Sequence, residues 1–122
     1  TDVQLFCSRV SDEIAFGPNQ MGLPKAEVEK RVEDMISLVG IEKLRDRAPY
    51  NLSMGEKKKV ALASVLAVNP KVLILDEPMN FLDVKSREWI KEFLSSMKGI
   101  KTIIIVSHSN DFDEMADKII NM

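Results

Sequence analysis

The chain has 122 residues, of which 45% are hydrophobic and 30% are charged, and its formal net charge is -2. This length suffices for one domain with a modest core, and the composition is ordinary for a globular protein. The near-neutral charge gives no sign of a nucleic-acid surface, and no apolar run reaches the roughly 20 residues of a membrane span. The single cysteine, Cys7, excludes an internal disulfide and is expected to be an inert thiol. No signal peptide is evident, and the start at Thr1 rather than Met suggests an excised or processed piece.

The first half of the chain is predicted to be helical and rich in loops. Phe16-Gly17-Pro18 combines two residues that interrupt helices, so we expect a break there. Between Pro24 and Gly40, apolar residues recur at helical spacing and predict an amphipathic helix that ends at Gly40. The apolar positions of this helix are Val28, Val32, Met35, Ile36 and Val39.

A further helix is predicted to start at Ser53, because Ser53 and Glu56 have the spacing of a capping box. Such a helix end also offers backbone N–H groups to a phosphate, with the Ser53 hydroxyl as a further donor and Gly55 allowing close approach. A capping box and a solvated first turn explain the same residues without a ligand. The helix is expected to end at Asn69-Pro70 and to pack through small residues, namely Val60, Ala61, Ala63, Ser64, Ala67 and Val68.

The second half alternates strand and helix. Residues 72–75 and Thr102–Val106 are predicted to be buried strands, and Asp83 is expected to cap the helix between them. This order predicts a parallel sheet with a right-handed crossover. A short helix over residues 111–116 and a last strand at Ile119-Ile120 are expected to follow. The crossover helix is predicted to end at Gly99 and to bury Trp89, Ile90, Phe93, Leu94 and Met97.

Two carboxylates, Asp76 and Glu77, stand where the first strand ends, before Pro78. Ligands bind at the carboxyl ends of strands in open α/β sheets. Because successive strand side chains point to opposite faces, we expect different roles, one acid holding Mg²⁺ and the other polarising an attacking water. An isolated pair of this kind is also explained as turn or helix-capping acids.

His108, the only histidine, follows the second strand and lies at the same sheet edge as the acids if the two strands are neighbours. Its imidazole is then placed to contact a phosphate oxygen or to orient the water, although a lone histidine near a helix start is often structural. A phosphate loop of the form G-x-x-x-x-G-K-[ST] is absent, because none of the five glycines is followed by Lys.

Four motifs, taken in order, resemble the signature motif, Walker B segment, D-loop and H-loop of ATP-binding cassette (ABC) ATPases. These motifs are Leu52-Ser53-Met54-Gly55-Glu56, Leu73-Ile74-Leu75-Asp76-Glu77-Pro78, Asn80-Phe81-Leu82-Asp83 and Ser107-His108. Residues 2–6, 15–18 and 39–53 are similar to the cobalt/nickel and energy-coupling-factor vitamin importers. The resemblance covers essentially the whole chain.

The resemblance implies an α/β fold, namely a partial P-loop NTPase-like ABC ATPase domain with a parallel sheet, helices and an α-helical subdomain. It divides the chain into a helical subdomain at residues 1–52 and, at residues 53–122, the signature helix with the Walker B, D-loop and H-loop part of the core. The family's Walker A loop and Q-loop would precede Thr1, and Gln4 is not the Q-loop residue.

The resemblance also implies residue roles. Asp76 would bind Mg²⁺, Glu77 would be the catalytic base or the acid that positions the water, and His108 would contact the γ-phosphate of ATP. Asp83 would lie at the interface of a head-to-tail dimer with a second ATPase subunit. The signature residues would complete the ATP site of the opposite subunit, and these are Ser53, Met54, Gly55 and Glu56.

Met54 departs from the family pattern, which usually has Gly at this place, whereas Glu56 is a tolerated variant. The Met54 side chain is expected to crowd the phosphate contact or to change the local conformation.

The function implied by the family is ATP hydrolysis coupled to import, at the cytoplasmic side of the membrane. Transmembrane permease subunits would dock on the helical subdomain, and no nucleic acid is expected as a partner. We expect the isolated chain to be inactive. A non-enzymatic interaction fragment and a DNA-repair type ABC ATPase are the alternatives, but the latter carries long heptad repeats before the signature that this chain lacks.

Overall fold

The computed structural model describes residues 9–107. It comprises two compact units, Thr1–Pro70 and Lys71–Met122, and each unit is described by itself. Cys7, His108 and the helix and strand predicted after His108 lie outside the described residues. Among residues 9–107, no helix is both long enough and apolar enough to cross a membrane. The predicted division into a helical subdomain at residues 1–52 and a core part at residues 53–122 stays a prediction. In the structure, the signature helix, Met54–Leu66, packs within the first unit.

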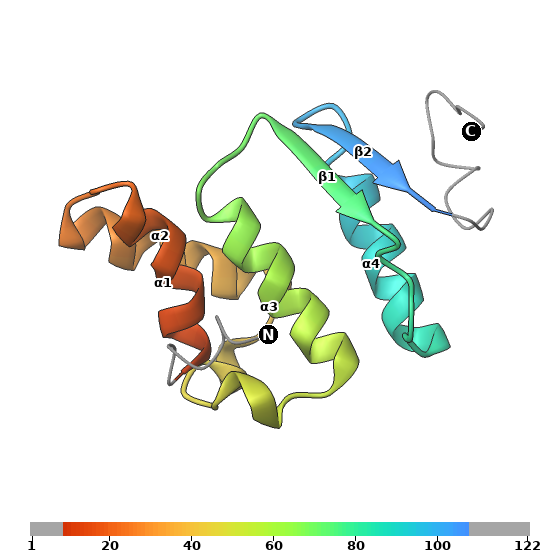
Figure 1. Ribbon diagram of the computed structural model, residues 1–122, viewed down its shortest axis with the longest axis horizontal. Helices are drawn as coiled ribbons and strands as arrows, with labels where there is room; N and C mark the ends of the chain where they lie inside the picture. Colours follow the sequence, from red (N-terminus) through yellow and green to blue (C-terminus); the bar gives the residue numbers. More distant parts are fainter. Residues whose placement is uncertain (1–8, 108–122) are drawn as a thin grey trace. The chain divides into compact units, whose positions relative to one another are not determined.

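The first unit is helical (Figure 1). Its elements are α1 (Val10–Gln20), α2 (Lys25–Val39), the 3₁₀ turns η2 (Glu42–Leu44) and η3 (Pro49–Asn51), and α3 (Met54–Leu66). Helix α1 contacts both α2 and α3, and α2 also contacts α3. The three helices bury apolar side chains that include Val10, Ile14, Val28, Val32, Ile36, Val39, Val60, Leu62, Ala63 and Leu66.

The predicted helix between Pro24 and Gly40 is confirmed as α2. Pro24 precedes its first residue, and Gly40 closes it at a φ of 70° in the left-handed region. The Gly40 N–H donates to Ser37 O (3.3 Å) and the Ile41 N–H donates to Ile36 O (3.1 Å). These two bonds form a Schellman motif, which satisfies the last carbonyls of the helix.

The predicted break at Phe16-Gly17-Pro18 is wrong, because α1 runs through all three residues to Gln20. Pro18 removes one hydrogen bond of the helix but is fully buried, so packing offsets that loss. Gly17 faces Val68 so closely that a Cβ at Gly17 would lie 2.6 Å from Val68 Cγ1. The glycine therefore serves a close helix approach that a local sequence pattern does not reveal.

The second unit contains β1 (Val72–Asp76), α4 (Val84–Ser96) and β2 (Thr102–Val106). The two strands are parallel neighbours, with Val72 opposite Thr102 and Asp76 opposite Val106. This confirms the predicted parallel pairing, and α4 forms the connection between the strands (Figure 1). Helix α4 buries Ile90, Phe93 and Leu94, as predicted, and Trp89 stacks on Phe93 with ring centroids 5.0 Å apart.

The prediction that both strands are buried is wrong for one face of the sheet. Within β1, Leu73 is buried, whereas Ile74 is 67% exposed. In the register of the pair, Ile74 lies opposite Ile104, which is also exposed. A parallel sheet is buried on both faces only where helices cover both. Among the described residues, the second unit has the single helix α4, so one face of the strand pair stays uncovered.

Candidate functional site

The signature segment forms the start of α3, as the capping box predicted. Ser53 Oγ accepts a hydrogen bond from the Glu56 N–H (3.2 Å), and Glu56 Oε1 accepts one from the Ser53 N–H (2.9 Å). Both halves of the capping box are therefore present. The Ser53 hydroxyl keeps its own O–H as a donor, because only its acceptor capacity is used in this bond.

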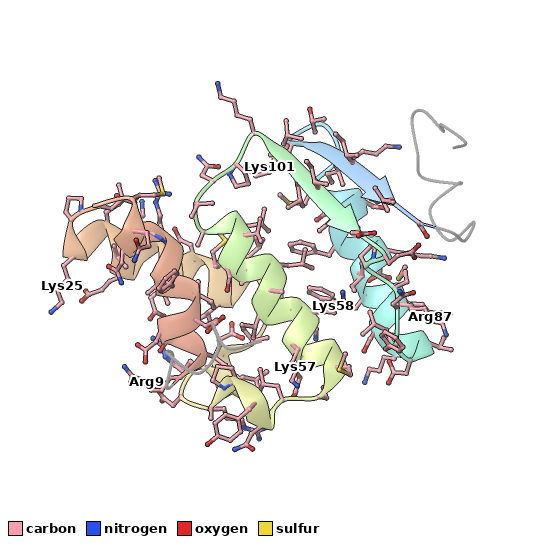
Figure 2. All side chains as sticks on the ribbon, in the orientation of Figure 1. Arg9, Lys25, Lys57, Lys58, Arg87 and Lys101 are labelled. Atoms are coloured by element: carbon pink, nitrogen blue, oxygen red, sulfur yellow. The ribbon has the colours of Figure 1, made fainter. Side chains whose placement is uncertain are left out.

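Met54 and Gly55 occupy the first turn of α3. Helix geometry leaves their N–H groups without an acceptor inside the helix, and the helix dipole favours an anion at this end. Met54 is 47% exposed and is the first residue of the regular helix α3. Of the two effects expected for Met54, a changed local conformation is therefore not seen. Lys57 and Lys58 follow in the next part of α3 and are half-buried (Figure 2).

The loop before α3 is fixed to the start of α1. The N–H groups of Val10 and Ser11 donate to Arg47 O (2.9 Å) and Arg45 O (3.0 Å), respectively. Arg45 in turn forms an ion pair with Glu33 of α2, and hydrogen bonding to this guanidinium lowers the pKa of the Glu33 carboxyl. These contacts use the otherwise unsatisfied N–H groups of α1 to hold the segment that leads to the signature.

The opposite end of α3 is held by α2. Arg31 Nη1 donates to the carbonyl of Ala67, the C-cap residue of α3, at 2.9 Å. Its Nε atom donates to Glu27 Oε2 (3.0 Å), so the part-buried guanidinium joins the two helices. A cation at a helix C-terminus also interacts favourably with the helix dipole. The signature helix is thus fixed at both ends within the first unit.

In the second unit, the acid pair marks the end of β1. Asp76 is the last strand residue and is exposed, opposite Val106 of β2. Glu77 has left the strand: its φ is 48°, and its N–H donates to Val106 O (2.7 Å). Strand alternation therefore does not determine the direction of the Glu77 side chain. A non-glycine residue in the left-handed region is strained by roughly 1–2 kcal/mol, and such strain clusters at functional sites.

A tight turn joins Glu77 to α4. The Asn80 N–H donates to Glu77 O (3.1 Å), and buried Met79 accepts from the Leu82 N–H through its carbonyl (3.3 Å). Phe81 lies at the tip, at a φ of 65°, and its side chain is 87% exposed. The sequence predicted no role for Phe81 beyond its place in the segment that resembles a D-loop.

Asp83 caps α4, as predicted. Its Oδ1 atom accepts a hydrogen bond from the Ser86 N–H at 2.8 Å. This backbone bond stabilises the ionised carboxylate and lowers the pKa of Asp83. Arg87 Nε donates to Leu82 O (3.1 Å), which ties the turn to the first turn of α4; Figure 2 labels Arg87 on this helix.

The candidate residues fall into two groups. Asp76, Glu77 and Asp83 belong to the second unit and follow β1, whereas Ser53 to Glu56 open α3 in the first unit. Strand β2 ends at Val106, level with Asp76, and leads through Ser107 toward His108, which lies outside the described residues.

The exposed carboxylate of Asp76 suits a magnesium ion whose other ligands are mainly water and phosphate. Within residues 9–107, no three His, Cys, Asp or Glu side chains gather to form a metal cage. Mg²⁺ is commonly bound by one or two carboxylates together with substrate phosphates, and an exposed Asp76 at the strand end provides one carboxylate. Separately, in the first unit, the first turn of α3 provides N–H donors of the kind that bind phosphate.

Comparison with known proteins agrees with these features. The ABC transporter family matches residues 3–80. A putative ABC transporter ATP-binding protein of Clostridium acetobutylicum is 56% identical over 93% of this chain and 48% of its own length. The nickel import ATP-binding protein LarO of Lactiplantibacillus plantarum is 51% identical over 89% of this chain and 46% of its own length.

Solved structures give the same result. CbiO1 of Clostridium perfringens, described as part of the ABC transporter complex cbiONQ, superposes with a TM-score of 0.77 at 42% identity. The match covers 84% of this chain and 41% of that protein, so the chain spans about half the length of the relatives that it matches. The fold is accordingly that of a partial ABC ATPase domain, and the chain belongs to the family of ABC transporter ATP-binding proteins.

Proposed function

We propose that this chain is the part of an ABC importer's ATP-hydrolysing subunit that carries the signature and the Walker B acids. The transporter would be of the cobalt/nickel or energy-coupling-factor vitamin type, which the names of its relatives favour. The observation that carries the proposal is the strained Glu77, held at a φ of 48° directly after Asp76 at the carboxyl end of β1. Glu77 follows the last residue of β1 at the carboxyl end of the strand, and in open α/β folds nucleotides bind at this edge of the sheet, which supports the proposal.

The proposed chemistry divides among the described residues. Asp76 would hold Mg²⁺, which when bound neutralises negative charge on the phosphates. Glu77 would accept a proton from the attacking water or orient it, because its carboxylate has left the strand. Ser53 and the N–H groups of the first turn of α3 would bind the terminal phosphate of ATP held by the opposite subunit. His108 would contact the same phosphate, and Asp83 would lie at the dimer interface.

The proposed partners are a second ATPase subunit and transmembrane permease subunits, so the protein would work as a peripheral subunit at the cytoplasmic side of the membrane. CbiO1 of Clostridium perfringens is described as part of a transporter complex, which supports a permease partner. We place the permease contact on residues 12–50. This segment exposes the large apolar side chains Phe16 and Leu38, which are 46% and 48% exposed.

The test is ATP hydrolysis by the full-length protein that contains this chain. Glu77→Gln removes the proposed proton acceptor at nearly constant size, and we expect hydrolysis to fall by about two orders of magnitude or more. Glu88→Gln is the matched control, since this substitution makes the same chemical change at an exposed position of α4. Equal activity of Glu77→Gln and the control would refute the assignment.

The 122-residue chain by itself is expected to hydrolyse no ATP, since no phosphate loop is present in its sequence. Phosphate release by the pure chain above that of its Glu77→Gln variant would overturn this expectation.

A further inference from the structure

Exposure divides the methionines of the described chain into distinct classes. Met54 and Met21 are 47% and 51% exposed, whereas Met79 and Met97 are buried at 6% and 7%. Met35 lies between these classes. Susceptibility of methionine to oxidants follows the exposure of its sulfur, so Met54 and Met21 should react first.

Met54 and Met21 differ in what surrounds them. Met21 is the C-cap residue of α1, at a helix end that presents carbonyl groups. Met54 is the first residue of α3, between the Ser53 cap and the N–H donors of the opening turn. A change of polarity at Met54 would therefore act on the N–H donors that are proposed to bind phosphate, whereas the same change at Met21 would not.

We propose that Met54 is a peroxide-sensitive modification site whose oxidation weakens the phosphate contact of the signature helix. This inference rests on the proposed function for its effect on ATP, but not for the oxidation itself. The Met54 sulfur attacks one oxygen of hydrogen peroxide, the O–O bond breaks and an S–O bond forms. The proton of the transferred hydroxyl group passes to the departing hydroxide. Sulfur is oxidised by two electrons to the sulfoxide, and the peroxide is reduced to water.

The physical reason lies in the sulfoxide oxygen. It is a polar acceptor with partial negative charge, introduced at the helix end that is to bind an anion. It competes with phosphate for the N–H groups of the first turn and repels the phosphate oxygens. A thioether does neither, and glycine, which the family usually has here, offers no sulfur to oxidise.

The first experiment is mass-spectrometric peptide mapping of the full-length protein during treatment with hydrogen peroxide. We expect Met54 and Met21 to form sulfoxide at least several-fold faster than Met79 and Met97. Oxidation of Met54 no faster than that of buried Met79 would overturn the proposal, whatever the protein's activity.

The second experiment compares ATP hydrolysis before and after peroxide treatment, as a ratio for each variant. We expect the wild type and the control Met21→Leu to lose activity several-fold and to recover it with a methionine sulfoxide reductase. In Met54→Leu, which keeps size without a thioether, the ratio should stay near one. Loss of the same size in Met54→Leu would overturn the proposal. No hydrolysis by the untreated protein would instead refute the proposed function. The relative oxidation rates of the methionines would still be decided by mass spectrometry alone.

Discussion

The close approach of Gly17 to Val68 predicts that Gly17→Ala destabilises the protein when residue 68 is Val and stabilises it when residue 68 is Ala. In Gly17→Ala, the new Cβ would lie 2.6 Å from Val68 Cγ1. That is about 1 Å closer than an ordinary carbon contact of about 3.5–4.0 Å. Overpacking of this kind costs about 1–3 kcal/mol, and the β-branched Val68 side chain is stiff at χ1. Alanine in place of glycine within a helix returns about 1 kcal/mol. The expected net result is a loss of about 1 kcal/mol, or about 4–8 °C in Tm for a unit of this size.

A second set of variants carries Val68→Ala, which removes the methyl group that the new Cβ would approach. In Val68→Ala, position 17 has room for a methyl group, so Gly17→Ala should there stabilise the protein by about 1 kcal/mol through helix propensity. Urea unfolding followed by far-ultraviolet circular dichroism reports on the helical first unit. Fluorescence of Trp89, the only tryptophan, reports on the second unit and serves as the control. The same sign of the Gly17→Ala effect in both backgrounds would show that the Val68 side chain does not limit the space at position 17.

Three further substitutions test the site residues. Ser53→Ala removes one half of the capping box and should lower the free energy of unfolding by about 1 kcal/mol, as measured by urea unfolding; an unchanged midpoint contradicts this. Glu77→Gly relieves the left-handed strain that Glu77→Gln retains, so the glycine variant should be the more stable of the two by about 1 kcal/mol. Urea unfolding followed by Trp89 fluorescence measures this difference, and the reverse order counts against strain at this residue. For Asp83, the folded-state pKa lies below the ordinary value of 3.8, so its stabilising contribution is present above that value and is lost as the pH falls through the folded pKa. Asp83→Asn keeps a capping residue without this titration, and its stability should depend less on pH below about 4 than that of the wild type; equal acid dependence would refute the assignment.

Local sequence signals predicted those elements whose ends are set by local chemistry. Gly40 ended α2 because a left-handed residue closes a helix, and Ser53 and Asp83 opened α3 and α4 through side chains that reach their own backbone. The course of α1 through Pro18 was not predictable in this way. It depends on burial of Pro18 and on contact with Val68, about fifty residues later in the chain.

The candidate site shows the same difference. The positions of Asp76 and Asp83 follow from the strand end and the helix cap, and both were predicted from residue type and spacing. The left-handed conformation of Glu77 was not, because its N–H binds Val106 O of a strand that comes later in the chain. Burial on both faces was predicted for β1 from its aliphatic run. Such a run indicates that a strand can be buried on both faces, but actual burial depends on helices that cover each face, and Ile74 of β1 is exposed.

We propose that Ser53 of one subunit and Glu77 of another serve the same ATP site. Full-length Ser53→Arg and Glu77→Gln proteins should each be inactive, because each homodimer lacks one component of both sites. In a mixed head-to-tail dimer, one site has both defects and the other has none. Mixing the two proteins in equal amounts under conditions that allow subunit exchange should therefore restore ATP hydrolysis to about a quarter of the wild-type rate. No recovery in a mixture in which heterodimers are shown to form would rule out a shared site, since each site would then take Ser53 and Glu77 from one subunit.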